Sequence, residues 1–326
     1  MKKSTRNMLI AGGIAFIGVS ALAAIHNYSS RYLMKFALDR EGPKKTEKEK
    51  EKIMSLSDFS EILERAMNAA SELESTQSEE IEIEAFDGIT LVGHWYCPEN
   101  PKRVIVAMHG WRSSWSQDFG LIAPFMFEND CAVLFAEQRA QGKSGGEYMG
   151  FGLLERYDCL SWINWVNERI ESRLPMYLCG ISMGGTTVLM ASGFELPENV
   201  KGIISDCAFT SPHAIWKHVV ESNFHLPYGI YNAAARDLCK KKILFGSDSY
   251  STLEAVKNSE KPILFIHGTD DHFVPIEMTY ENYKACTSEK RLFVVPGADH
   301  AISYVIDKEG YEQTVKSFWQ DLEKDI

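Results

Sequence analysis

Residues 175–185 read Pro-Met-Tyr-Leu-Cys-Gly-Ile-Ser-Met-Gly-Gly and pass directly into a helix-forming run at 186–191. The apolar run ends in the pattern Gly-x-Ser-x-Gly, formed by Gly180, Ser182 and Gly184. A serine held on a sharp turn between a strand and a helix is exposed for chemistry, and glycine tolerates the close backbone approach that such a turn imposes. An ordinary glycine-rich turn is the alternative interpretation, but the strand–turn–helix setting favours a reactive serine.

The chain beyond Ser182 also offers a base and an acid. His300 follows a short β-branched strand expected at 291–295, and a second apolar strand at 262–267 precedes a loop with two carboxylates. A serine hydroxyl is a weak nucleophile at neutral pH, so it needs a general base such as His300. A carboxylate that accepts the other imidazole N–H fixes the tautomer of that base.

These motifs together resemble those of the α/β-hydrolase family, over roughly residues 79–326. The run 267–275 is similar to the family's acid loop, His-Gly-x-x-Asp-x-x-Val-Pro, and this pattern selects Asp271 over its neighbour Asp270. Some members of the family place the acid after the sixth strand instead. Asp206 occupies that position here and is the alternative acid.

Two further segments carry the resemblance. The first is the strand expected at 104–108 with His109 and the following Gly110-Trp111, which is similar to the family's His-Gly loop. The second is 137–144, which is similar to the family's Asp-x-Arg-Gly-x-Gly-x-Ser segment but departs from it at Glu137 and Ala140. The resemblance implies that backbone N–H groups near the serine form an oxyanion hole. The implied catalytic residues are Ser182, Asp271 and His300, and the implied oxyanion-hole donors are the N–H groups of Trp111 and Met183.

The alternation of strand-like and helix-like runs after residue 79 indicates an α/β fold with parallel βαβ units. The first two strands are separated by Asp87-Gly88, which predicts a hairpin. We expect the α/β-hydrolase fold, a mostly parallel central sheet flanked by helices, with residues 208–260 as a small cap after the sixth strand. Packing of 208–260 as ordinary lateral helices is equally compatible with the sequence. The expected strands span 81–86, 90–96, 104–108, 131–136, 176–179, 202–205, 263–266 and 292–295.

The N-terminal part divides into residues 1–28, an expected membrane anchor or signal segment, and 29–78, a charged linker with an amphipathic helix. Residues 8–25 are uncharged and largely apolar and follow three cations, a pattern typical of a short membrane span. Small residues at 21–23 resemble a signal-peptidase site, so cleavage and secretion are the alternative. A buried core helix is a third interpretation. The spacing of apolar residues at 54–73 predicts an amphipathic helix.

Composition excludes several classes of function. The net charge of −11 and a pI near 5.4 have the wrong sign for binding nucleic acid. The chain has neither a dinucleotide-binding Gly-x-Gly-x-x-Gly after a strand nor a Cys-x-x-Cys or His-Glu-x-x-His motif, so we expect no cofactor and no metal. The seven cysteines are widely spread and suggest free thiols rather than a disulfide framework.

The sequence therefore predicts a serine hydrolase that cleaves carboxylic esters, lipid-like esters included, through an acyl-enzyme. The family resemblance keeps peptidases, aminopeptidases and thioesterases open, since they share the same three residues. A non-enzymatic binding protein of the same fold is less favoured, because the chain retains a candidate for every catalytic role.

Overall fold

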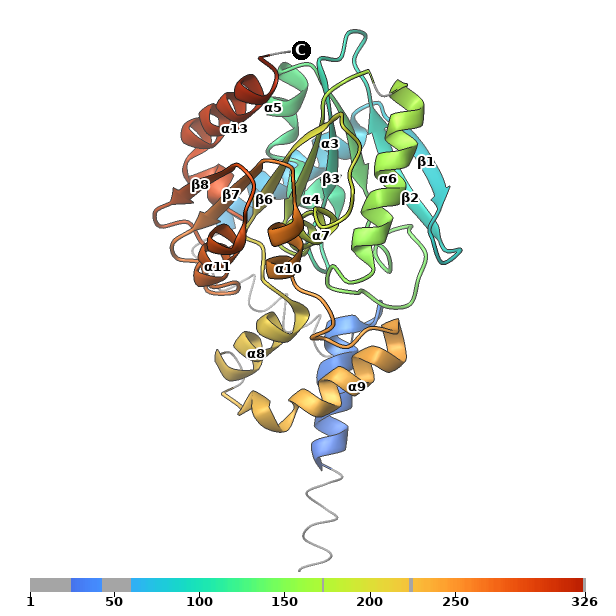
Figure 1. Ribbon diagram of the computed structural model, residues 1–326, viewed down its shortest axis with the longest axis vertical. Coiled ribbons are helices and arrows are strands. Elements are labelled where there is room, and N and C mark those ends of the chain that lie inside the picture. The colour runs from blue at the N-terminus through green and yellow to red at the C-terminus, as the bar shows by residue number, and fades with distance from the viewer. Residues whose placement is uncertain (1–24, 43–59, 172, 223–224, 325–326) are drawn as a thin grey trace, which may run out of the picture.

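A computed structural model describes residues 25–42, 60–171, 173–222 and 225–324. Within this part of the chain eight strands form one sheet in the order β1-β2-β4-β3-β5-β6-β7-β8 (Figure 1). β1 and β2 pair antiparallel, β2 pairs antiparallel with β4, and all later pairs are parallel. The strands are β1 Glu79–Glu84, β2 Thr90–Tyr96, β3 Arg103–Met108, β4 Cys131–Ala136, β5 Met176–Ile181, β6 Val200–Asp206, β7 Ile263–Gly268 and β8 Lys290–Val295.

The predicted α/β-hydrolase fold is confirmed, and each expected strand is present with ends shifted by no more than two residues. The hairpin between β1 and β2 turns at Gly88, which has a φ of +82°, a value that suits glycine. Ala85 N–H donates to the carbonyl of Ile89 at 2.9 Å and closes the turn.

Both faces of the sheet are buried, because the central strands are apolar along their whole length. In β3, Val104, Val106 and Met108 belong to one core, while Ile105 and Ala107 belong to the core on the other face. This alternation is the two-residue period of a strand. Each core is completed by helices that cross over between strands, as expected for parallel βαβ units.

Among the described residues, four helices cover the first face of the sheet and five cover the second. The first set is α6 Glu155–Ile170, α7 Met183–Ala191, α10 Thr252–Asn258 and α11 Glu277–Ala285. The second set is α3 Ser60–Ser75, α4 Trp115–Phe119, α5 Ala123–Glu128, α12 Ser303–Ile306 and α13 Lys308–Leu322. α3 corresponds to the amphipathic helix predicted at 54–73, whose first residues lie outside the described part.

A helical lobe projects from the carboxyl ends of the parallel strands (Figure 1). We define it as residues 25–42, helical over 25–38, together with α8 Pro212–Ser222, η1 Tyr228–Ile230 and α9 Asn232–Ile243. The rest of the described chain is called the sheet body. His26 and Tyr231 pack with ring centroids 5.4 Å apart, and the Lys242 ammonium pairs with Asp39 at 2.7 Å. The N-terminal helix and the 208–260 segment thus pack together as one unit.

The expected membrane segment at 8–25 lies outside the described residues, apart from Ile25. None of the described helices has the length and apolar character needed to span a bilayer. The anchor and its signal-peptide alternative stay predictions. All seven cysteines are free thiols, six of them buried, as the sequence suggested.

Candidate active site

Ser182 lies on the turn between β5 and α7 with φ 55° and ψ −116°, a conformation that non-glycine residues rarely adopt. Its N–H donates to the carbonyl of Asp206 at 2.9 Å. A Cβ on Gly180 would lie 2.1 Å from the carbonyl oxygen of Gly184, and a Cβ on Gly184 would lie 1.8 Å from that of Met108. The two glycines of the pattern are therefore required by close backbone packing around the serine.

Ser182, His300 and Asp271 form a continuous chain of hydrogen bonds. Nε2 of His300 is 2.9 Å from the Ser182 hydroxyl, and Nδ1 of His300 is 2.7 Å from Oδ2 of Asp271. The three residues follow β5, β8 and β7, whose carboxyl ends meet at one edge of the sheet. His300 keeps 22% of its side chain exposed while Asp271 is fully buried, so the imidazole connects solvent to a buried carboxylate.

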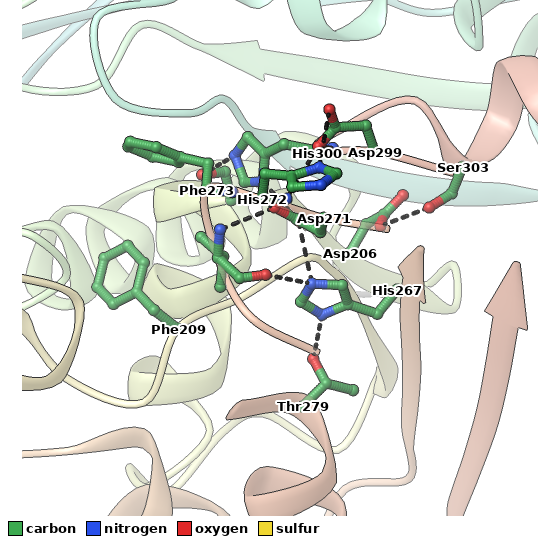
Figure 2. A network of polar contacts seen from close by, with 12 residues as sticks. Asp206, Phe209, His267, Asp271, His272, Phe273, Thr279, Asp299, His300 and Ser303 are labelled. Atoms are coloured by element: carbon green, nitrogen blue, oxygen red, sulfur yellow. Dashed lines mark hydrogen bonds and ion pairs between the residues drawn. The ribbon is translucent and has the colours of Figure 1, made fainter. Parts of the chain in front are cut away.

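The Asp271 carboxylate is fixed on both oxygens (Figure 2). Oδ1 accepts the backbone N–H groups of Phe273 and Val274 at 2.9 and 2.7 Å, and Oδ2 also lies 3.0 Å from Nε2 of His267. Burial by itself raises the pKa of the Asp271 carboxyl, but the hydrogen bonds from His267 and His300 outweigh burial and hold that pKa well below its usual range. Asp271 is therefore ionised at neutral pH.

His267 has a defined tautomer in this arrangement. Its Nε2 lies 3.0 Å from the Asp271 carboxylate and 2.9 Å from the carbonyl oxygen of Val274, two groups that only accept, so Nε2 carries the proton. Nδ1 then accepts from the Thr279 hydroxyl at 2.6 Å (Figure 2). His267 thus orients the acid loop without touching Ser182.

The other carboxylates near His300 do not bond its ring. Asp206 is buried and accepts from the Ser303 hydroxyl at 3.4 Å, while Asp270 accepts from the Thr269 hydroxyl. Asp299 accepts backbone N–H groups, that of His300 included. Burial raises the pKa of Asp206 to about 6, in spite of the opposing effects of His267 and His300. Of the two candidate acids from the sequence, the structure brings Asp271 and not Asp206 to His300.

Trp111 and Met183 both lie on backbone next to the serine. Met183 is the first residue of α7, where N–H groups have no partner within the helix. Trp111 belongs to the loop 109–113 after β3, which passes close to Ser182, because a Cβ on Gly110 would lie 3.4 Å from the Cβ of Ser182. Two backbone segments that could supply N–H donors thus flank the hydroxyl.

No sequence motif points to Cys207, yet its sulfur lies beside Asp271 and His300. Its sulfur, a carboxylate oxygen of Asp271 and a ring nitrogen of His300 are all within 4.8 Å of one another. Burial raises the pKa of the Cys207 thiol well above its usual range, which keeps the thiol protonated. The Asp271 carboxylate and Nδ1 of His300 bond each other at 2.7 Å in this arrangement.

The two departures from the family pattern have local explanations. Glu137 reaches the buried ring of His94 at 2.8 Å and also accepts the backbone N–H of Lys143, so the longer acid closes the loop that follows β4. Ala140 has a φ of +57°, the left-handed region in which the family pattern has glycine. Neither residue contacts Ser182 or His300 through a hydrogen bond found here.

An apolar cluster joins the helical lobe to the serine. It includes Met183 beside Ser182, Phe151 and Trp216 with ring centroids 5.2 Å apart, and Met34 and Leu38 from the N-terminal helix. Trp111 packs against this cluster. The predicted cap segment therefore contributes apolar side chains near the serine, although the domain limit 208–260 itself stays a prediction.

Comparison with known proteins agrees with this geometry. Residues 99–238 match the family model for serine aminopeptidases of type S33. The chain is 24% identical over 235 residues to YqkD of Bacillus subtilis, covering 72% of this chain and 77% of that one. It is 27% identical over 241 residues to YfhR of Escherichia coli K12, covering 72% of this chain and 76% of that one.

Solved structures share the fold at low identity. The Pyrococcus furiosus esterase Pf2001 superposes with a TM-score of 0.63 at 22% identity, covering 77% of this chain and 93% of that chain. Est1E of Butyrivibrio proteoclasticus, solved with ferulic acid, gives 0.58 at 20% identity, covering 74% and 98%. An acylaminoacyl peptidase superposes with a TM-score of 0.55 at 19% identity, covering 76% of this chain and 41% of that chain.

The sheet order and the solved structures together define the fold. The chain has the α/β-hydrolase fold, and its residues 99–238 are similar to the S33 serine aminopeptidase family.

Proposed function

We propose that this protein is a serine hydrolase that cleaves carboxylic esters through an acyl-enzyme. Ser182 is the nucleophile, His300 the general base and Asp271 the acid. The observation that carries the proposal is the chain of hydrogen bonds from Ser182 through His300 to Asp271, at 2.9 and 2.7 Å.

The chemistry follows from these contacts. As the Ser182 oxygen attacks the ester carbonyl carbon, Nε2 of His300 takes the hydroxyl proton, and ionised Asp271 stabilises the imidazolium. The N–H groups of Trp111 and Met183 donate to the carbonyl oxygen as it becomes an oxyanion, each worth about 3–4 kcal/mol. His300 then gives its proton to the departing alkoxide, and water attacks the acyl-enzyme by the same route.

The apolar cluster supports an ester with an apolar acyl or alcohol group. Met183 and Trp216 belong to the buried apolar cluster on the lobe side of the serine, and the partly exposed Trp111 packs against it. A substrate methylene buried against such an apolar surface contributes about 0.8 kcal/mol. The similarity to two esterases in fold, one of them bound to an aromatic acid, is in keeping with this substrate class.

The test combines a fluorophosphonate probe with a panel of p-nitrophenyl esters of increasing acyl length, using the wild type and Ser182→Ala. We expect the probe to label the wild type at Ser182 and the rate to rise with acyl length before it levels off. A wild type that neither reacts with the probe nor hydrolyses any ester would overturn the proposal.

An aminopeptidase is the second candidate, because the matched family model carries that description. Such an enzyme needs a carboxylate to bind the substrate ammonium. The described carboxylates near the serine are already engaged, Asp118 by the N–H of Gly110, Asp206 by Ser303 and Asp271 by His300. Aminoacyl p-nitroanilides added to the panel separate the two candidates, since faster hydrolysis of these than of the esters would favour the peptidase.

A further inference from the structure

The end of the N-terminal helix is fastened to the loop that carries Trp111. The indole N–H of Trp111 donates to the carbonyl of Ala37 at 2.8 Å. The guanidinium of Arg112 donates to the carbonyls of Phe36 at 2.9 Å, Asp39 at 2.5 Å and Arg40 at 3.1 Å. Residues more than 70 positions apart in the sequence are joined here.

These contacts suit the end of a helix in both geometry and charge. The last carbonyls of a helix have no partner within it, and the C-terminal end of the helix dipole favours a cation. The planar fork of Arg112 reaches several carbonyls at once, which a lysine ammonium on a flexible stem does less well. The same guanidinium stacks 5.1 Å from the Trp111 ring centroid, and the rings of Trp111 and Phe36 meet edge to face at 5.2 Å.

Arg112 adopts a strained backbone conformation, with a φ of +52°. Such a conformation costs on the order of 1 kcal/mol for a residue with a side chain, and it persists only where surrounding contacts determine it. The contacts of Arg112 include hydrogen bonds to three carbonyls at the helix end. The helix therefore stabilises a strained residue immediately after the oxyanion-hole donor.

The inner side of the same loop is fixed independently of the lobe. Asp118 accepts the N–H of Gly110 at 2.6 Å, and the imidazole of His109 lies between the Gly110 carbonyl at 2.8 Å and the Gln138 N–H at 3.0 Å. Trp111 is thus the point at which the loop passes from an anchor in the sheet body to an anchor in the lobe.

The helix end is itself immobilised on its other side. Arg40 donates to the carbonyls of Ser144 at 2.7 Å and Gly142 at 2.5 Å, and its own N–H donates to the carbonyl of Glu147 at 2.9 Å. Asp39 pairs with Lys242 of α9. The loop 109–113 is consequently held against a rigid partner.

We propose that Arg112 is a positioning residue, and that residues 25–40 act through it to aim the Trp111 N–H at the developing oxyanion. The inference rests on the proposed serine hydrolase function. A donor that is displaced by a fraction of an ångström still allows substrate to bind, but it stabilises the transition state less. The helical lobe therefore contributes to the rate of the reaction as well as to the substrate pocket.

The test uses the full-length protein with Arg112→Lys, Arg112→Ala and Trp111→Phe, and with Arg31→Ala as the matched control. Arg31 lies on the same helix, is exposed and bonds Asn27 one turn away. For each variant we would measure kcat and KM on a short ester, the melting temperature, and inhibition by a trifluoromethyl ketone and by its methyl ketone analogue. The trifluoromethyl ketone forms a tetrahedral oxyanion on Ser182, and the methyl ketone binds chiefly as the ground state.

For Arg112→Lys we expect kcat to fall by about 10-fold, and for Arg112→Ala by about 100-fold, within the loss typical of one oxyanion-hole donor. Affinity for the trifluoromethyl ketone should fall by the same factors while KM and methyl ketone affinity stay constant. Trp111→Phe should lower kcat and trifluoromethyl ketone affinity by smaller factors, again with constant KM and methyl ketone affinity. Arg31→Ala should match the wild type in all four quantities.

Unchanged kcat in Arg112→Lys and Arg112→Ala, or equal weakening of both ketones, would overturn the inference. If Arg112→Ala does not fold, kcat and the two ketone affinities of Arg112→Lys and Trp111→Phe test the inference instead. If the wild type is active and labelled by the probe, and the Arg112 variants keep its kcat, this inference fails and the proposed function stands. If the wild type is neither labelled nor active, both fail.

Discussion

The sheet body and the helical lobe hold the site in different ways. In the sheet body, Ser182, Asp271 and His300 are placed by strands and by backbone contacts, such as the bond from Ser182 N–H to the Asp206 carbonyl. The lobe is joined to the site by side chains of the loop after β3, since the Trp111 indole and the Arg112 guanidinium donate to the lobe carbonyls of Ala37 and Phe36. The placement of Ser182, Asp271 and His300 thus depends on topology, whereas the placement of the Trp111 loop depends on a few long-range side-chain bonds.

This difference implies that changes in the sheet body affect the chemistry more strongly than changes in the lobe. Ser182→Ala removes the proposed nucleophile, and we expect turnover to fall by on the order of 10⁶-fold and probe labelling to vanish. The change leaves the turn itself intact, so melting temperature should vary little. Purified Ser182→Ala protein that still reacts with the probe would show that another residue is the nucleophile, and Ser144→Ala is the matched control.

The second largest effect on turnover is expected for Asp271, the proposed acid. Asp271→Asn keeps the shape of the loop but lets His300 adopt the wrong tautomer, which costs roughly 10⁴-fold in turnover in a well-studied triad. We expect a loss of that order in kcat, and far milder effects for Asp206→Asn and Asp270→Asn, since neither contacts the His300 ring. A crippled Asp206→Asn enzyme beside an active Asp271→Asn enzyme would move the acid to β6.

Truncation tests the lobe directly. Removal of residues 1–24 leaves the whole described helix, so we expect a soluble protein with wild-type kcat on a short ester. Removal of residues 1–42 takes away the carbonyls that Arg112 contacts, and kcat should fall by about 100-fold, as for Arg112→Ala. Equal activity of the two truncated proteins would show that the sheet body positions Trp111 alone. A membrane fractionation of full-length and shorter protein checks the anchor predicted at 8–25.

The sequence predicted the sheet body well because its signals are local. Short apolar or alternating runs predicted every strand, and short motifs selected Ser182, His300 and Asp271, which lie within hydrogen-bond reach of one another. The contact of Arg112 with Phe36 and Asp39 left no such signal. An arginine after a tryptophan reads as a surface residue, and a lone sequence does not show which distant carbonyls it meets. The sequence favoured a loop-shaping role for His267, but its tautomer is defined only by the positions of Thr279 and Val274 around the ring.

The smallest expected effect concerns stability, and it contrasts the two buried acids of the site. Asp206 has a pKa raised from its ordinary 3.8 to about 6, whereas that of Asp271 is lowered. A raised pKa means that ionised Asp206 destabilises the folded state. This penalty begins as pH rises above about 4, is complete above about 6, and amounts to at most about 3 kcal/mol.

Asp206→Asn removes that charge, so it should raise the melting temperature by a few degrees at pH 8 and have little effect at pH 4. Asp271→Asn should do the reverse at pH 8, because it replaces a carboxylate that is stabilised by His267 and His300 and so lowers the melting temperature. Asp270 is exposed, so Asp270→Asn serves as the control and should leave the melting temperature unchanged at both pH 8 and pH 4. Thermal unfolding at the two pH values measures all three variants. A lower melting temperature for Asp206→Asn at pH 8 would show that its carboxylate is compensated by contacts stronger than the 3.4 Å bond from Ser303.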